Sequence, residues 1–284
     1  MRCGPSECNS LRVILSRGAT KGSLSIQGFY GRGAKAILSL ASLAQDDNGG
    51  RMTIGGMLTP RRRRGIELLD DPRIDPAVRA QSIGDVTRAN RWLGGLRAAS
   101  IELRDALRGR DAAIVLDVGT GLADIPEFAA GESPHCAIVT IGVDEAQSLL
   151  VAARSRMTFG VCANALTLPF RDRSVDIVLC SQVLHHFEHI DAQRLVSELH
   201  RVARVAVIIS DLRRSWIAAA GFWMVSFPMR FHRVTRHDGT VSVLRGFTAA
   251  ELRDIVRSAT GVAPLVRHRL GWRLTARWSP LGAE

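Results

Sequence analysis

Two glycines and an acidic residue follow a hydrophobic run near the middle of the chain, and together they could bind a nucleotide-like ligand. The run ends at Asp117, and Gly119, Thr120 and Gly121 then open a predicted helix. Glycines let the backbone turn tightly and bring its amides close to a ligand. A carboxylate at the strand end could also hold an ammonium group. A plain strand-to-helix turn can look the same, and Asp124 stands where the dinucleotide fingerprint has its third glycine.

A second acidic residue ends the next hydrophobic run. Asp144 follows Ile141-Gly142-Val143, and a carboxylate in this position can accept both hydroxyls of a ribose. Asp144 could instead cap the helix that follows. Its combination with the first glycine loop favours the ligand interpretation.

The segment from Asn164 to Val178 carries the most specific motif. It reads NALTLPFRDRSVDIV and resembles the class I S-adenosylmethionine (SAM) dependent methyltransferases. The resemblance is strongest to the methyltransferase type 11 group, which includes the ubiquinone and menaquinone C-methyltransferases and carries the pattern D-A-x-x-L-P-F-x-D-x-S-F-D-x-V. With the two acidic motifs above and the Leu-His-His-Phe run at 184–187, the resemblance covers about residues 112–211.

The resemblance implies that the cofactor is SAM and assigns a role to each matching position. Asn164 stands where the family has an aspartate that accepts from the adenine amino group, and its carbonyl can still accept. The main chain at Ala165 would approach the adenine, and Leu166 would pack on it. The implied cofactor-binding residues are Asp117, Gly119, Thr120, Gly121, Asp144, Asn164, Ala165, Leu166, Ser181 and Gln182. Residues 201–205 lack the family's Pro-Gly-Gly turn, so we expect a different connection there.

Two histidines are candidate catalytic bases. His185 and His186 follow the predicted fourth strand, at the mouth of a pocket in an open α/β sheet, and imidazole can remove a proton near neutral pH. One or both could merely pack or cap the next helix. His237 and Asp238 form a second candidate pair, as a base or substrate contact, with a polar surface turn as the alternative. We expect no metal site.

The apolar stretch Trp216–Met229 bears on the methyl acceptor. It is too short to span a bilayer comfortably, and it could be a lid helix, an interfacial membrane helix or a core helix. A lid would suit a small hydrophobic acceptor that is aromatic, quinone-like or a polyketide, methylated on oxygen or carbon. Peripheral membrane contact is a further expectation, whereas no obligate protein partner is evident.

Hydrophobic runs and helical periodicity alternate along the chain, which is typical of an α/β fold. We predict a Rossmann-like seven-stranded sheet, mostly parallel with one antiparallel C-terminal strand and helices on both faces. The predicted strands are 112–118, 137–143, 159–162, 175–180, 205–209, 262–268 and 272–278. The predicted domains are an extension over 1–63 that is disordered or non-native, N-terminal helices capping the pocket over 64–110, and a methyltransferase domain over 111–284 with a lid insert at about 212–246.

Net charge and cysteine content limit the classes of function and the cellular compartment that suit this chain. Residues 1–64 carry eight of the eleven net positive charges, so the body of the chain is not expected to bind nucleic acid. The five scattered cysteines suit a reducing compartment, and we expect a cytoplasmic protein. A nucleic-acid methyltransferase, an NAD(P)-dependent oxidoreductase and a sensor that binds SAM without turnover remain the alternatives.

Overall fold

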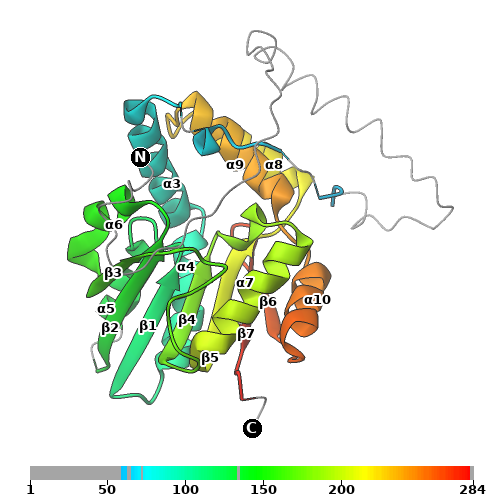
Figure 1. Cartoon of the computed structure of the whole chain (residues 1–284). Helices are drawn as coiled ribbons and strands as arrows, with labels where there is room; N and C mark the ends of the chain where they lie inside the picture. Colours follow the sequence, from blue (N-terminus) through cyan, green and yellow to red (C-terminus); the bar gives the residue numbers. More distant parts are fainter. Residues whose placement is uncertain (1–58, 63–64, 72, 133–134, 282–284) are drawn as a thin grey trace, which may run out of the picture.

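The computed structural model describes residues 59–62, 65–71, 73–132 and 135–281 of the chain (Figure 1). The predicted extension up to residue 58 lies outside them. The strands are β1 (Ala112–Val118), β2 (Ala137–Asp144), β3 (Phe159–Cys162), β4 (Val175–Ser181), β5 (Ala203–Leu212), β6 (Leu265–Arg269) and β7 (Arg273–Trp278). The helices are η2 (Leu68–Asp70), α3 (Pro76–Trp92), α4 (Gly95–Leu107), α5 (Asp124–Glu132), α6 (Gln147–Ala153), η3 (Arg154–Arg156), η4 (Leu184–His186), α7 (His189–Val202), α8 (Trp216–Val225), α9 (Arg233–Arg245) and α10 (Ala249–Thr260).

Seven strands form one sheet in the order β3-β2-β1-β4-β5-β7-β6. The β7 strand is antiparallel to both β5 and β6, while the pairs among β1 to β5 are parallel. The predicted fold class is therefore confirmed. The strand order reverses between β1 and β4, and ligands of open α/β sheets bind at the carboxyl ends of the strands beside such a reversal.

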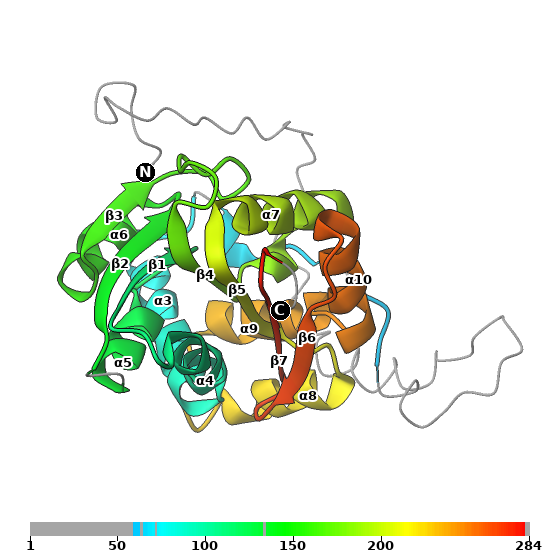
Figure 2. The ribbon, with the colours of Figure 1, turned by 90° about the horizontal axis from the view of Figure 1, so that it is seen from below.

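Helices cover both faces of the sheet (Figure 2). On one face α4 packs on β1, β4 and β5 through residues such as Leu103 and Ile208. On the other face α7 and α10 pack through residues such as Leu199 and Ile255. Burial of these aliphatic side chains supplies most of the free energy that holds the layers together.

Local signals account for several helix ends. Asp75 accepts a hydrogen bond from Ala77 N at 2.7 Å, and Pro76 occupies the first helical position of α3. Thr248 and Glu251 form the predicted capping box of α10. These features match the sequence-based expectation.

The helix α7 runs directly into β5. Val202 ends the helix and Ala203 begins the strand, so no loop residue separates them. This junction replaces the absent Pro-Gly-Gly turn, as the sequence predicted.

Three helices lie beyond the carboxyl end of the parallel strands. In Figure 1, α3, α8 and α9 lie together beyond one end of the sheet. The stretch predicted as Trp216–Met229 is helical as α8 and stops at Val225. No helix in the described part of the chain combines the length and hydrophobicity that a bilayer span requires.

Candidate functional site

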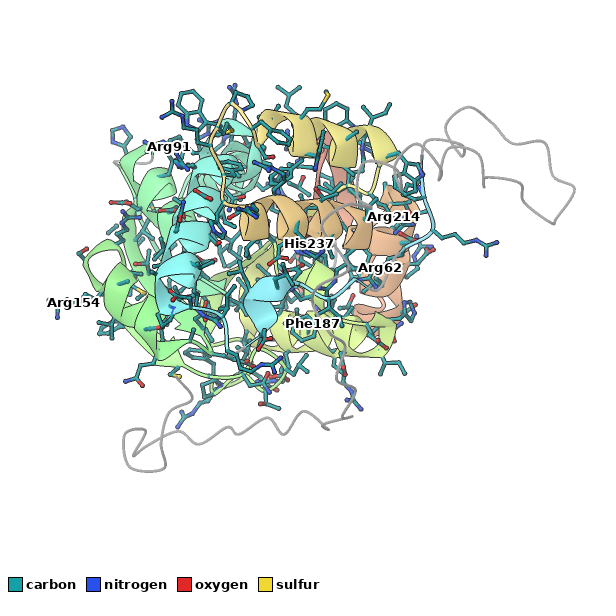
Figure 3. The ribbon with its side chains drawn as sticks, turned by 90° about the horizontal axis from the view of Figure 1, so that it is seen from above. Arg62, Arg91, Arg154, Phe187, Arg214 and His237 are labelled. Atoms are coloured by element: carbon teal, nitrogen blue, oxygen red, sulfur yellow. The ribbon has the colours of Figure 1, made fainter. Side chains whose placement is uncertain are left out.

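A cavity of about 960 Å³ lies between the carboxyl end of the sheet and the covering helices. It is lined by the glycine loop after β1, the residues after β4, and parts of α3, α8 and α9. Eight of the predicted site residues line it, namely Asp117, Gly119, Thr120, Gly121, Ser181, Gln182, His185 and His186. Figure 3 looks onto this end of the molecule, where α3, α8 and α9 extend over the sheet.

The glycine loop has the geometry that glycine permits best. Gly119 adopts φ +72° and Gly121 adopts φ +54°. A Cβ atom on Gly119 would lie 2.3 Å from Cγ2 of Val183, so a larger residue at this position would be both strained and crowded. The loop therefore keeps its backbone open to the cavity.

Asp117 is a buried carboxylate without a cationic partner among the described residues. Its Oδ2 accepts a hydrogen bond from Thr120 Oγ1 at 2.7 Å. Burial, aided by the negative charges of Asp144 and Asp124, raises the pKa of Asp117 to about 7 despite the Thr120 hydrogen bond. A bound ammonium group would favour the ionised form.

Asp144 and Asn164 stand at the ends of the neighbouring strands and do not line the cavity. Asp144 accepts hydrogen bonds from Gly121 N at 3.0 Å and from Ala146 N at 2.9 Å. Burial raises its pKa, and these backbone bonds oppose the shift. Asp144 pairs with Cys162 of β3, which places Asn164 close by. The predicted Ala165 and Leu166 also lie outside the cavity lining.

The side-chain amide of Asn164 presents a different group from the one we expected. Its Oδ1 accepts a hydrogen bond from Leu166 N at 2.8 Å. Its buried Nδ2 has no hydrogen-bond partner among the described residues. The unpaired group is therefore a hydrogen-bond donor. A hydrogen bond from the adenine amino group to Asn164 would have to use the second lone pair of Oδ1.

His185 forms a buried pair with Asp211 at the end of β5. His185 Nδ1 lies 2.7 Å from Asp211 Oδ1, and His185 N donates to Asp211 Oδ2 at 3.0 Å. Burial opposes ionisation of Asp211, but His185 and the hydrogen bond from Leu212 N hold its pKa below the ordinary value. The carboxylate fixes the imidazole ring and leaves Nε2 as the nitrogen for proton transfer.

Sequence analysis missed Asp211, because the fifth strand was predicted to end at residue 209. The signal was present nonetheless. An acidic residue at a strand end had already identified Asp117 and Asp144.

His186 lies beside His185 and close to a further acidic residue, Glu67. The two rings lie 4.2 Å apart, and His186 Nδ1 lies 3.7 Å from Glu67 Oε2. Donor atoms of Glu67, His185 and His186 all lie within 4.8 Å of one another, a spacing that could hold a metal ion. However, Arg245 Nη1 already donates to Glu67 Oε1 at 3.2 Å, so a cation would meet a fixed positive charge. We interpret Glu67 as a carboxylate that orients His186.

His237 and Asp238 belong to helix α9, so the alternative interpretation, a polar surface turn, is wrong. Asp238 is buried and accepts hydrogen bonds from Leu68 N and Leu69 N at 2.8 and 2.9 Å. Its Oδ1 also lies 2.8 Å from His237 Nδ1. Asp238 lines the cavity, and its oxygens anchor η2 to α9. His237 is visible on α9 in Figure 3.

Arg62 fastens the N-terminal segment to the site, although it falls within the predicted extension. Its guanidinium donates to the carbonyl oxygens of Arg245, His185 and Phe187 at 2.7 to 3.1 Å. It also lies 4.3 Å from the ring centroid of Phe247. Pro60 is buried and accepts from Arg214 Nε. The packed body therefore reaches back to Pro60, a few residues before the predicted boundary.

Residues 116–209 match the family model described as "Methyltransferase domain". This match spans less than half of the chain. A curated relative, the demethylmenaquinone methyltransferase of Thermotoga maritima, is 32% identical over 92 residues, which are 32% of this chain and 38% of the relative. The match therefore spans well under half of the relative's length.

Solved structures of methyltransferases share the fold of this chain. A SAM-dependent methyltransferase from Aquifex aeolicus is 15% identical, with a TM-score of 0.51 over 73% of this chain and 99% of that one. The plantazolicin methyltransferase BamL, solved with a triazolic desmethylPZN analog and SAH (S-adenosylhomocysteine), is 16% identical, with a TM-score of 0.50 over 68% and 71%. At these identities, the likeness to both structures shows the fold alone.

The residues around the glycine loop fit SAM, the cofactor that the sequence resemblance implies. Asp117 offers a buried carboxylate with no cationic partner in the described part of the chain, and the methionine part of SAM carries an ammonium group. Ser181 Oγ is likewise buried with no hydrogen-bond partner among the residues that the structure describes. These unpaired polar groups border the same cavity as Gly119.

Proposed function

We propose that the protein transfers a methyl group from SAM to a small hydrophobic acceptor that is aromatic, quinone-like or a polyketide. One observation carries the proposal. A single cavity joins the glycine loop and Asp117 to the His185–Asp211 pair and to an apolar wall. When bound, SAM supplies an activated methyl group, and alignment of the two reactants lowers the barrier.

The apolar wall supports the hydrophobic acceptor. It is formed by Ile83 and Val86 of α3, Phe222 and Val225 of α8, and Val243 of α9. Since α8 contributes to the wall, the lid role predicted for this stretch is favoured over a purely core role. Ile217, Met224 and Phe227 point outward and are about half exposed or more. Peripheral membrane contact through these residues stays a prediction.

His185 is the proposed general base for a hydroxyl or an acidic carbon. Asp211 holds Nδ1–H, so Nε2 accepts the acceptor's proton while the new bond to the methyl carbon forms and the bond from that carbon to sulfur breaks. The imidazolium is stabilised by the ionised Asp211 and then returns its proton to solvent. General base catalysis of this kind contributes about 10²–10⁴-fold in rate.

Methyl transfer is tested with SAM labelled in its methyl group and a panel of demethylmenaquinone, alkylated phenols and aromatic polyketides. We expect label in at least one organic product. The absence of labelled product across the panel and in lipid extracts, with SAM binding intact, would favour the sensor that binds SAM without turnover.

Cofactor binding is tested separately by calorimetry with SAH. Asp144→Ala should weaken SAH binding by roughly 1–3 kcal/mol, because the ribose hydroxyls lose a charged acceptor. Glu145→Ala removes the same charge from the next, exposed position and should leave the affinity unchanged. Equal losses in both variants would contradict the ribose contact.

A further inference from the structure

Arg273 places a buried positive charge in the wall of the cavity. It is the first residue of β7 and pairs with Leu212 at the end of β5. Only 4% of its surface is exposed. Its Nη1 donates to Gln182 Oε1 at 2.7 Å, and its Nε is buried with no hydrogen-bond partner among the described residues. No carboxylate in the described part of the chain forms a salt bridge with this guanidinium.

Another buried arginine shows how the fold otherwise treats such a charge. Arg214 is 5% exposed, donates to the carbonyl oxygens of Pro60 and Gly246, and pairs with Glu251 at 2.7 Å. Arg273 has one neutral partner by comparison. Burial lowers its pKa to about 10, although the charge of Asp211 opposes the shift. Burying a charged group without a counter-charge is costly, which makes such a group a candidate for ligand recognition.

The helix α4 begins against the same guanidinium. Gly94 precedes the helix at φ +81° and provides no side-chain cap. A Cβ atom on Gly95 would lie 3.3 Å from Cζ of Arg273, so the arginine packs directly on the first turn. A helix N-terminus carries a partial positive charge. Two positive features therefore lie in contact beside the cavity that Leu96 and Arg273 line, and an anion bound to the guanidinium would lie close to both.

We propose that Arg273 and the first turn of α4 bind a carboxylate group of the methyl acceptor. This inference rests on the proposed function and narrows its substrate class to hydrophobic carboxylic acids. A planar guanidinium suits a carboxylate, which it can bind through two parallel hydrogen bonds. The apolar wall of the cavity would hold the rest of such a molecule.

The carboxylate of SAM is the alternative ligand for Arg273. The positions of Arg273 and Asp117 in the sheet favour the acceptor. Arg273 pairs with Leu212, the residue that follows Asp211, whereas Asp117 lies at the end of β1 and contacts Thr120 of the glycine loop. Arg273 therefore belongs to the part of the cavity that holds His185 and Asp211.

The test uses the full chain saturated with SAH and compares 3-phenylpropionate with its neutral amide by calorimetry. We expect the acid to bind about tenfold more tightly than the amide or better, as one charged hydrogen-bonded pair provides. Arg273→Met should remove this preference and leave SAH affinity within about twofold. Arg91→Met changes an exposed arginine that also lines the cavity, and it should retain the preference.

Two results would overturn the proposal. Equal affinity of the wild-type protein for acid and amide would show that no carboxylate site exists, and this comparison needs no variant. A loss of SAH affinity in Arg273→Met, matched by no loss of the acid preference, would assign the arginine to the cofactor. These binding measurements require no turnover. Failure of the proposed function would instead appear as the absence of labelled product in the methyl-transfer experiment.

Discussion

Asp117 has a hydroxyl partner and no cation, and its pKa of about 7 makes cofactor binding depend on pH. The ammonium group of SAH prefers the ionised carboxylate. Affinity should therefore rise from about pH 6 to pH 8, with a slope that approaches tenfold per pH unit below pH 7. Calorimetry at three pH values measures it. Asp117→Asn should bind more weakly and without this slope, and a slope that persists in the variant would assign the titration to another group.

The same carboxylate should destabilise the ligand-free protein. The folded-state pKa of about 7 lies above the ordinary value of 3.8, so the folded state holds this proton more tightly than the unfolded chain. The resulting stability is fully present below about pH 4 and is lost as the pH rises through about 7. Asp117→Asn should therefore raise the free energy of unfolding at pH 8, measured in urea without ligand. An unchanged or lower free energy of unfolding would contradict a destabilising buried carboxylate at Asp117.

His185 and Asp211 should act as a unit. His185→Gln and Asp211→Asn should each lower the methyl-transfer rate by about 10²-fold or more, with SAH affinity retained. The double variant should lose little more than either single one, because each change disables the same proton transfer. Multiplicative losses in the double variant would show that the two residues act independently.

The sequence predicted the elements much better than the contacts between them. Hydrophobic runs set the seven strands, and capping signals at Asp75 and Thr248 set two helix starts, because these features are local. The glycine loop and the histidine pair were found for the same reason. Arg273 could not be found, since its significance depends on burial beneath α4, a helix far away in the sequence. Asp211 could have been identified as an acidic residue near a strand end. It was missed because the fifth strand was predicted to end at residue 209.

The capping box of α10 allows a matched test of helix stability. Thr248→Ala removes the hydrogen bond to Glu251 N and should cost about 1 kcal/mol of unfolding free energy. Glu251→Ala removes the reciprocal hydrogen bond from Thr248 N and leaves the buried Arg214 without its carboxylate at 2.7 Å, so it should cost more. Urea denaturation measures both changes. Equal costs would show that the ion pair contributes nothing beyond the cap.

Arg62 and Pro60 attach the N-terminal segment to the body of the molecule, Arg62 through the carbonyl oxygens of His185 and Phe187. A chain that starts at Met57 keeps the contacts of both residues, whereas one that starts at Gly65 loses them. The shorter chain should lose on the order of 2 kcal/mol of unfolding free energy, which lowers Tm by roughly 4–8 °C. Calorimetric melting compares the two chains, with Arg62→Ala in the longer chain as the point control. Identical Tm values would show that this segment adds no stability.

The direct passage from α7 into β5, together with the register shift of β5 against β4 between Ala203 and Ala206, sets the side of the sheet that each later residue of β5 faces. Successive side chains of a strand face opposite sides of the sheet, so one inserted residue would turn every following side chain over. Asp211 would then exchange sides with its neighbours, and His185 would lose its carboxylate. The number of residues between Val202 and Asp211 thus determines whether Asp211 faces His185 and can support its proposed proton transfer. Homologues that keep this acid should therefore show neither insertion nor deletion within that span.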